Sequence, residues 1–308
     1  MSNIQDKREG AALNGTDLDG VFAPMATPFE DDKILFDGLI RNVEKMNSSG
    51  LKGYFVLGTN GEYKSLSVPE REKVLKTVIE RRARGKVIMA GTGAESTKET
   101  IDLTLGAADL GADMVSLLMP HFFTRKIDDD VLISFILEVA AASPVPVVLY
   151  NNPSVAAGVT ISSEVIRRVG GHPNIIGIKD SSKASYKDSL SAAVPGFSVM
   201  AGSANFFLEV MKLGGSGGVL SLANIYPDEC ARLHRAFREG NEALVEELND
   251  KLIILNKSVS GNYGVAGVKA AMDMVGYTGG VPRRPIKGLT PEQRESLASE
   301  LKQKGFKA

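Results

Sequence analysis

The sequence of 308 residues has very little cysteine and histidine, with one cysteine (Cys230) and three histidines. A single cysteine excludes a disulfide within the chain and fits a reducing compartment. So few thiol and imidazole groups also argue against a transition-metal site, and we expect no bound metal. These absences exclude the small disulfide-stabilised domains and point away from zinc enzymes.

The chain also lacks an excess of charge and a long hydrophobic run. Its 36 Lys and Arg against 37 Asp and Glu argue against a nucleic-acid footprint or a membrane-surface patch. No apolar run reaches the roughly 18–20 residues of a membrane span. The opening "MSNIQDKREGAALNGTD" mixes acids with bases and has no apolar core. We expect residues 1–15 to be a loose tail without a signal or transit peptide, and the protein to be soluble and cytoplasmic.

Short apolar runs rich in β-branched residues recur along the chain, and a helical pattern follows each. Near-continuous apolar runs are typical of parallel strands that are covered on both faces. The runs are "GVFAPMATPF" (20–29), "GYFVLG" (53–58), "KVIMAGTG" (86–93), "ADMVSLLMP" (112–120), "PVVLYNN" (146–152), "IIGIKD" (175–180), "SVMAGS" (198–203) and "GGVLSL" (217–222). Starts spaced by roughly 20–35 residues predict an α/β fold, a (β/α)8 TIM barrel over 16–240. The purely helical pattern of 241–308 predicts a C-terminal extension of the same domain.

A doubly wound sheet is the alternative architecture, and "AGTGAEST" (90–97) is its best support. This segment has two glycines of a dinucleotide fingerprint, but Ser96 occupies the position of the third. We interpret Ser96 as a helix N-cap, with Glu99 completing a capping box. The glycines of "LGGSGGVL" (213–220) precede the eighth strand, at the end of a barrel opposite its active site. We therefore attribute them to close packing of strand and helix.

Polar residues gather where the predicted strands end, which is where barrel enzymes carry their chemistry. The segments are "GTNGE" (58–62), "MPHFF" (119–123), "YNNPS" (150–154), "KDSS" (179–182) and "GSAN" (202–205). We expect one mouth to be lined by Thr59, Asn60, Tyr150, Lys179 and Ser203.

Lys179 ends an otherwise apolar strand, although lysine is almost never fully buried without a partner. An amine desolvated by apolar walls loses its charge more easily and can attack a carbonyl carbon. The resulting imine draws electrons from the adjacent carbon, so that carbon–carbon bonds can break or form. Tyr150 can move the protons of such a cycle. The structural alternative is a lysine whose amine extends to an acid such as Asp180; Tyr150 and the Gly-Thr-Asn-Gly turn favour the chemical interpretation.

The motifs "GTNGE", "YNNP" and "GIKDSS", in this order and spacing, resemble the dihydrodipicolinate synthase / N-acetylneuraminate lyase family. The resemblance covers nearly the whole chain. It implies a class I aldolase-type lyase that acts on pyruvate or another 2-oxo acid without a metal or organic cofactor, usually as a homotetramer. It implies Lys179 as the Schiff-base lysine and Tyr150 as the proton shuttle. It also implies that the Thr59–Asn60 turn binds the substrate carboxylate, a role that suits a loop rich in free N–H donors.

Further residues near the mouth receive lesser roles. The resemblance suggests that Ser181 contacts the substrate, and we count Ser203 and Val219 as substrate-binding too. We expect Glu62 to be a buried anchor of the carboxylate loop. We expect His121 to be a packing or hydrogen-bonding residue, and Asp180 to hold loop N–H groups.

Two positions depart from the synthase pattern. Synthases usually read "YNVPSRTG", in which the arginine binds the carboxyl end of the second substrate; Val155 stands at that position here. They also carry a tyrosine soon after the strand-four proline, which reaches into the neighbouring subunit's site; Phe122 stands there. "GTNGE", "HPNIIGIKDS" and "YGVAGVKAAMDMVGYTGG" look more like 4-hydroxy-2-oxoglutarate aldolases, although these usually keep the same tyrosine.

The leading hypothesis is therefore a lyase that cleaves or forms a 4-hydroxy-2-oxo acid, with pyruvate and an aldehyde as its partners. The alternatives are a 4-hydroxy-tetrahydrodipicolinate synthase, an aldolase or dehydratase of a 2-keto-3-deoxy sugar acid, and a catalytically silent sensor of 2-oxo acids. The identity of the aldehyde stays open at this point.

Overall fold

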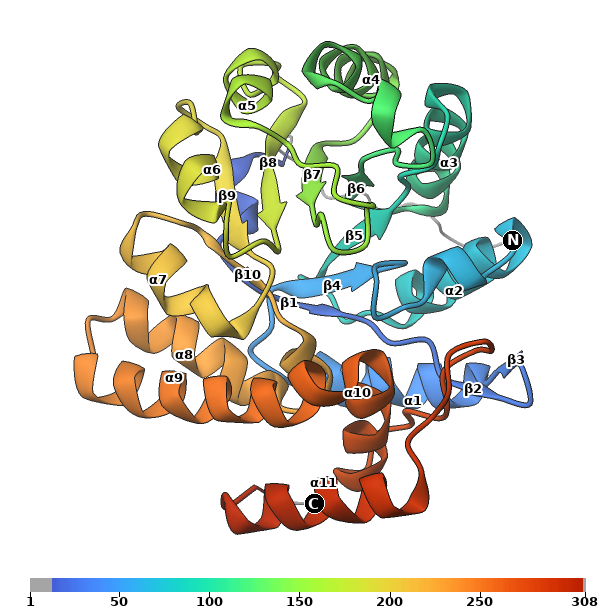
Figure 1. Cartoon of the computed structure of the whole chain (residues 1–308), viewed down its shortest axis with the longest axis vertical. Helices are drawn as coiled ribbons and strands as arrows, with labels where there is room; N and C mark the ends of the chain where they lie inside the picture. The colour runs from blue at the N-terminus through green and yellow to red at the C-terminus, as the bar shows by residue number, and fades with distance from the viewer. Residues whose placement is uncertain (1–12, 307–308) are drawn as a thin grey trace.

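A computed structural model describes residues 13–306 as a closed barrel of eight parallel strands surrounded by helices (Figure 1). The first strand pairs with both the second and the last, which closes the ring. The barrel strands are β1 (Gly20–Pro24), β4 (Gly53–Val56), β5 (Val87–Gly91), β6 (Met114–Leu118), β7 (Val147–Asn151), β8 (Ile175–Asp180), β9 (Ser198–Ala201) and β10 (Gly217–Val219). The (β/α)8 barrel prediction is confirmed, and the doubly wound sheet is excluded.

The helices that follow the strands begin at local sequence signals. Ser67 and Glu70 form a capping box at the start of α2. Ser96 accepts a hydrogen bond from the Glu99 N–H at the start of α3, as predicted, but the Glu99 side chain does not return a bond to the Ser96 N–H, so the predicted capping box is not formed. The barrel helices are α1 (Phe36–Asn47), α2 (Val68–Arg81), α3 (Thr97–Leu110), α4 (Asp129–Ala142), α5 (Ser163–Val169), α6 (Tyr186–Ala192), α7 (Phe207–Lys212) and α8 (Pro227–Arg238). No helix within residues 13–306 is long and apolar enough to span a membrane.

The glycines at 217 and 218 are required by close packing. A Cβ on Gly217 would lie 1.9 Å from the carbonyl oxygen of Gly20 on β1. A Cβ on Gly218 would lie 2.8 Å from the ring of Phe207 on α7. These distances are too short for any side chain, so the interpretation of this segment as a packing element and not a phosphate cradle is supported.

The first strand is shorter than the apolar run predicted for 20–29. The strand β1 ends at Pro24, and Phe29–Glu30 instead forms β2 of a small antiparallel hairpin with β3 (Lys33–Ile34). Pro24 and Pro28 carry no N–H to donate to a continuing ladder, which explains the early end. The tail predicted for 1–15 lies outside the described residues up to position 12, while Gly15–Leu18 form a 3-10 turn (η1).

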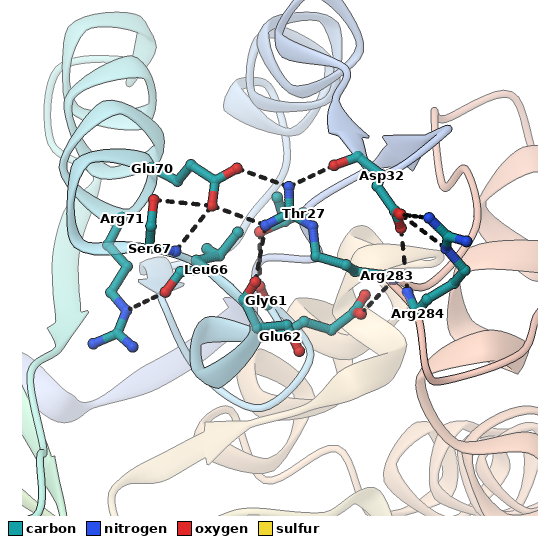
Figure 2. Close-up of polar contacts among 11 residues, drawn as sticks. Thr27, Asp32, Gly61, Glu62, Leu66, Ser67, Glu70, Arg71, Arg283 and Arg284 are labelled. Atoms are coloured by element: carbon teal, nitrogen blue, oxygen red, sulfur yellow. Dashed lines mark hydrogen bonds and ion pairs between the residues drawn. The ribbon is translucent and has the colours of Figure 1, made fainter.

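Four helical elements form the C-terminal part of the chain: α9 (Glu242–Asn256), the π-helical turn η6 (Lys257–Gly261), α10 (Asn262–Met274) and α11 (Pro291–Gln303). They gather on one side of the barrel, where α9 packs on α8 (Figure 1). The segment after α10 then reaches the mouth loops of β1 and β4. Arg283 donates to the carbonyl of Asp32 at 2.6 Å (Figure 2), and to that of Ser65 at 2.8 Å.

Arg283 also forms a bidentate ion pair with Glu70 on α2, with N–O distances of 2.7 and 2.8 Å (Figure 2). The hydrogen bonds from Arg283 lower the pKa of Glu70 to about 2, from an ordinary value of 4.5. A carboxyl group whose pKa is lowered by folding stabilises the folded state at every pH above its ordinary, unfolded-state pKa. This contribution is lost as the pH falls from that pKa through the lower pKa of the folded state.

We therefore expect the free energy of unfolding of the wild type and of Glu70→Gln to converge as the pH falls from about 5 towards 2. The amide of the variant still accepts from the Ser67 N–H, so the helix cap is retained. Urea unfolding of both proteins between roughly pH 6 and pH 3 checks this. A difference in unfolding free energy that stays constant over this range would show that the ion pair does not contribute.

Candidate active site

Lys179 and Tyr150 lie side by side at the carboxyl ends of adjacent strands, where the β7–β8 register pairs them. The Lys179 Nζ lies 3.7 Å from the centre of the Tyr150 ring and 5.0 Å from that of Phe55. The lysine is only 4% exposed. No ion pair joins it to Asp180 or to any other carboxylate within residues 13–306. The alternative of a lysine paired with Asp180 is therefore not what the structure forms.

The Tyr150 hydroxyl is held by two polar neighbours. It lies 3.0 Å from the Thr59 Oγ1 and accepts a hydrogen bond of 3.0 Å from the Asn152 Nδ2. Burial raises the pKa of this phenol, but the nearby Lys179 charge and the hydrogen bonds outweigh burial and hold the pKa below its usual value. Thr59 is exposed, so its hydroxyl connects the buried Tyr150 hydroxyl with the open end of the barrel.

The turn after β4 presents unpaired donors to the mouth. Leu57 and Glu62 adopt left-handed backbone angles (φ 62° and 53°) at its two ends. The N–H groups of Gly61 and Glu62 bond back within the turn, whereas those of Thr59 and Asn60 make no hydrogen bond within the described chain. The Asn60 Nδ2 is likewise buried without a partner there. Two adjacent free N–H groups beside a hydroxyl suit a carboxylate, as in other backbone anion sites.

Asp180 fixes the end of β8. Its carboxylate is fully buried and accepts from the Ser182 N–H at 2.8 Å, the Ser189 Oγ at 2.7 Å and the Ser185 Oγ at 3.0 Å. The prediction that Asp180 holds loop N–H groups is met by the Ser182 bond, and the hydroxyls add to it. A charge satisfied on several sides is rigid, so Asp180 stabilises the backbone on which Lys179 stands.

The other predicted substrate-binding residues differ in what they offer. The Ser181 Oγ is buried without a partner among residues 13–306 and lies against Gly202. The Ser203 hydroxyl takes part in a local turn, in which it accepts a hydrogen bond of 3.3 Å from the Asn205 N–H. Val219 ends β10, is buried and carries no polar side-chain atom. Within the described residues none of the three is hydrogen-bonded to Lys179 or Tyr150, and of the three only Ser181 has a buried hydroxyl without a partner.

The loop after β6 is organised by an acid that the sequence did not single out. The Glu95 Oε2 accepts from the N–H groups of His121 and Phe122, both at 2.8 Å. The His121 Nδ1 lies 3.0 Å from the Met119 carbonyl oxygen and 3.3 Å from Glu95 Oε1. His121 is therefore a hydrogen-bonding residue of the loop, as expected. Its neighbour Phe122 points outward, 75% exposed, and supplies no hydroxyl to Tyr150.

Two further residues of the site were missed by sequence reasoning. Asn152 stands two positions after Tyr150, the spacing at which residues of an extended chain face the same way, and this was the available signal. Phe55 packs edge-on against Tyr150 with ring centres 5.9 Å apart, and no local pattern marks it. The described residues contain no group of three or more His, Cys, Asp or Glu side chains that could hold a metal ion.

Comparisons with known proteins identify a family over nearly the whole chain. The model of the dihydrodipicolinate synthetase family matches residues 17–304. A 4-hydroxy-tetrahydrodipicolinate synthase of Methanococcoides burtonii is 34% identical, over 94% of this chain and 99% of that protein. A probable mitochondrial 4-hydroxy-2-oxoglutarate aldolase of Emericella nidulans is 33% identical, over 91% of this chain and 92% of that protein.

A solved structure shows the same likeness in three dimensions. The chloride-inhibited dihydrodipicolinate synthase of Acinetobacter baumannii, complexed with pyruvate, matches with a TM-score of 0.86 and 30% identity, over 94% of this chain and 99% of that one. The family match thus spans the barrel and the C-terminal helices together. The chain belongs to the dihydrodipicolinate synthetase family and is a lyase of that family.

Proposed function

We propose that the protein is a pyruvate-dependent class I aldolase that cleaves or forms a 4-hydroxy-2-oxo acid through an imine on Lys179. One observation carries this proposal. A buried lysine amine with no carboxylate partner lies 3.7 Å from the ring centre of Tyr150, whose hydroxyl contacts Thr59 at the carboxylate loop. This arrangement supports the proposal that one mouth holds a nucleophile, a proton carrier and an anion site.

The first half of the cycle forms the imine. The substrate carboxylate binds the free N–H groups of Thr59 and Asn60 and the Thr59 hydroxyl, which orients the adjacent carbonyl towards Lys179. The neutral amine attacks the carbonyl carbon, and the carbonyl oxygen leaves as water after protonation. The protonated imine that results is the electron sink for the next step.

The second half breaks the carbon–carbon bond. Tyr150 accepts the proton of the 4-hydroxyl through its phenolate form, for which its lowered pKa is suited. The C3–C4 bond breaks, its electron pair enters the imine to give an enamine, and the aldehyde departs. Protonation at C3 and addition of water then release pyruvate and regenerate Lys179. Synthesis runs through the same steps in reverse.

The relatives' names do not decide the second partner, because a synthase and a probable aldolase match at almost equal identity. Residues at the distal side of the site favour the aldolase. Val155 stands where the synthase pattern has an arginine, and Phe122 supplies no hydroxyl. Arginine's planar fork is the usual partner of a carboxylate, and in the synthase pattern it binds the carboxyl end of the second substrate. Its absence therefore disfavours aspartate semialdehyde as that substrate.

We expect aspartate semialdehyde to be a poor acceptor for the pyruvate imine, and glyoxylate or a neutral or hydroxylated aldehyde to be a better one. The loss of one charge-assisted hydrogen bond costs about 1.5–3 kcal/mol, roughly a ten- to hundredfold loss of affinity. The test compares kcat/KM for these acceptors at saturating pyruvate. Val155→Arg should shift the preference towards aspartate semialdehyde. A wild-type preference for that aldehyde would support the synthase instead.

An assay of the products released from a panel of 2-oxo acids separates the remaining alternatives. A 2-keto-3-deoxy sugar acid consumed without release of pyruvate would indicate a dehydratase, and pyruvate binding without turnover of any member would indicate a sensor.

We further propose a cytoplasmic homotetramer, the assembly implied by the family. The exposed Phe122 and Phe123, whose rings meet edge-to-face at 5.0 Å, support burial by another subunit, and the mass of the particle in solution tests it.

A further inference from the structure

A buried ion pair lies directly behind the carboxylate loop. Lys269 of α10 pairs with Glu62, and their side chains are 0% and 2% exposed. The Lys269 Nζ also donates to the Val281 carbonyl at 3.0 Å and lies 4.4 Å from the centre of the Phe29 ring. Burial lowers the pKa of Lys269 to about 8, although Glu62 opposes that shift. The charges of Lys269 and Glu62 are therefore both buried, and neither residue takes part in the proposed catalytic steps.

Stability alone does not explain such a pair. Buried ion pairs are often replaced by apolar residues with no loss of stability, because desolvation offsets their attraction. A buried ion pair, unlike an apolar contact, fixes the orientation of the two side chains that form it. The carboxylate of Glu62 is fixed by the ion pair with Lys269. It also accepts a hydrogen bond of 2.8 Å from the Arg283 N–H (Figure 2).

The turn that runs from Leu57 to Glu62 has a backbone conformation that requires support from its surroundings. Leu57 and Glu62 are both non-glycine residues in the left-handed region, a conformation that persists only where the surroundings impose it. The Thr27 Oγ1 donates to the Gly61 carbonyl at 2.9 Å (Figure 2), and the Arg283 guanidinium donates to the Ser65 carbonyl at 2.8 Å. The segment that carries Thr59 and Asn60 is thus followed by three residues, Gly61, Glu62 and Ser65, that are each held by contacts with other parts of the chain.

We propose that Lys269 and Glu62 are positioning residues for substrate binding: the C-terminal extension, through this pair, holds the Thr59–Asn60 turn in the shape that binds the 2-oxo acid carboxylate. The inference rests on the proposed function, because it takes this turn as the carboxylate site. Neither residue touches the substrate. Their effect is exerted through the backbone of Glu62, which is continuous with the turn.

The test measures the pyruvate concentration that gives half-maximal labelling of Lys179 when borohydride traps the imine in the full-length protein. For the double variant Glu62→Gln/Lys269→Met we expect this concentration to rise about 10- to 100-fold, since small misplacements of a binding group have effects of this size. Maximal labelling should stay unchanged. The double variant leaves no orphaned buried charge, so it should fold even where Lys269→Met alone does not.

Arg82→Met is the matched control. It breaks the ion pair with Asp113 at the opposite end of the barrel, so it should lower the melting temperature and leave the half-maximal pyruvate concentration within about twofold of the wild type. A double variant that labels at wild-type pyruvate concentrations would overturn the positioning role. A wild type that traps no pyruvate at all would instead overturn the proposed function, and this inference with it.

Discussion

Tyr150→Phe is expected to slow turnover by about 10²–10⁴-fold while the imine on Lys179 still forms, because this is the usual contribution of a positioned general acid or base. The substitution removes the hydroxyl that contacts Thr59 and Asn152, and it keeps the aromatic ring that lies against the Lys179 amine. Proton transfer should therefore be lost and the apolar surroundings of the amine retained. Steady-state kcat and the yield of trapped imine, measured on the same preparation, separate the two effects.

Tyr54→Phe provides the control for this substitution. Tyr54 is also a fully buried barrel tyrosine, but its hydroxyl bonds to Asn47 at 2.9 Å, near the start of β4 and away from the mouth. Its loss should cost stability and leave kcat unchanged. If Tyr150→Phe turned over at the wild-type rate, the proton carrier would have to be Thr59, His121 or bound water.

Lys179→Met is expected to lower activity by about 10⁴-fold or more, the scale of loss when an enzyme is deprived of its covalent nucleophile. The fold should survive, because the variant replaces an unpaired buried amine by an apolar chain of similar length. We therefore expect a melting temperature equal to or above that of the wild type, together with the loss of turnover. That combination distinguishes a chemical role from a structural one.

Lys86→Met serves as its control. Lys86 lies at the opposite end of the barrel, where its Nζ donates to the carbonyls of Ser49 and Leu51 at 2.6 and 2.7 Å. This variant should lose stability, since two buried acceptors are left without their donor, and keep full turnover. Comparable activity losses in both lysine variants would indicate a general effect of removing a lysine and would count against Lys179 as the nucleophile.

The barrel and the adjacency of Lys179 and Tyr150 could be predicted because both depend on local patterns. Apolar runs marked the strands, and in a parallel barrel the residues that end neighbouring strands meet at one rim. The prediction was weaker where one run concealed two elements. The segment 20–29 contains one polar side chain, that of Thr27, and otherwise reads as one apolar run, yet its two prolines interrupt the ladder and its last residue belongs to a hairpin.

The pairing of Glu62 with Lys269 could not be predicted, because it joins residues far apart in sequence through packing of the C-terminal helices on the barrel. A signal was nevertheless present. Lys269 interrupts the apolar segment "GVAGVKAAM" just as Lys179 interrupts "IIGIK", and both lysines are buried. A lone lysine in an apolar run thus indicated a buried amine in both places, but only the fold reveals that Lys269 pairs with a carboxylate and that Lys179 lies against Tyr150 instead.

Borohydride reduction in the presence of pyruvate tests the central claim most directly. Reduction converts the imine into a stable secondary amine, so the account predicts one added three-carbon acid on one peptide, the one that contains Lys179. Lys179→Met should remain unlabelled, and Lys86→Met should be labelled like the wild type. Labelling at another lysine, or no labelling of the wild type at saturating pyruvate, would contradict the Schiff-base mechanism.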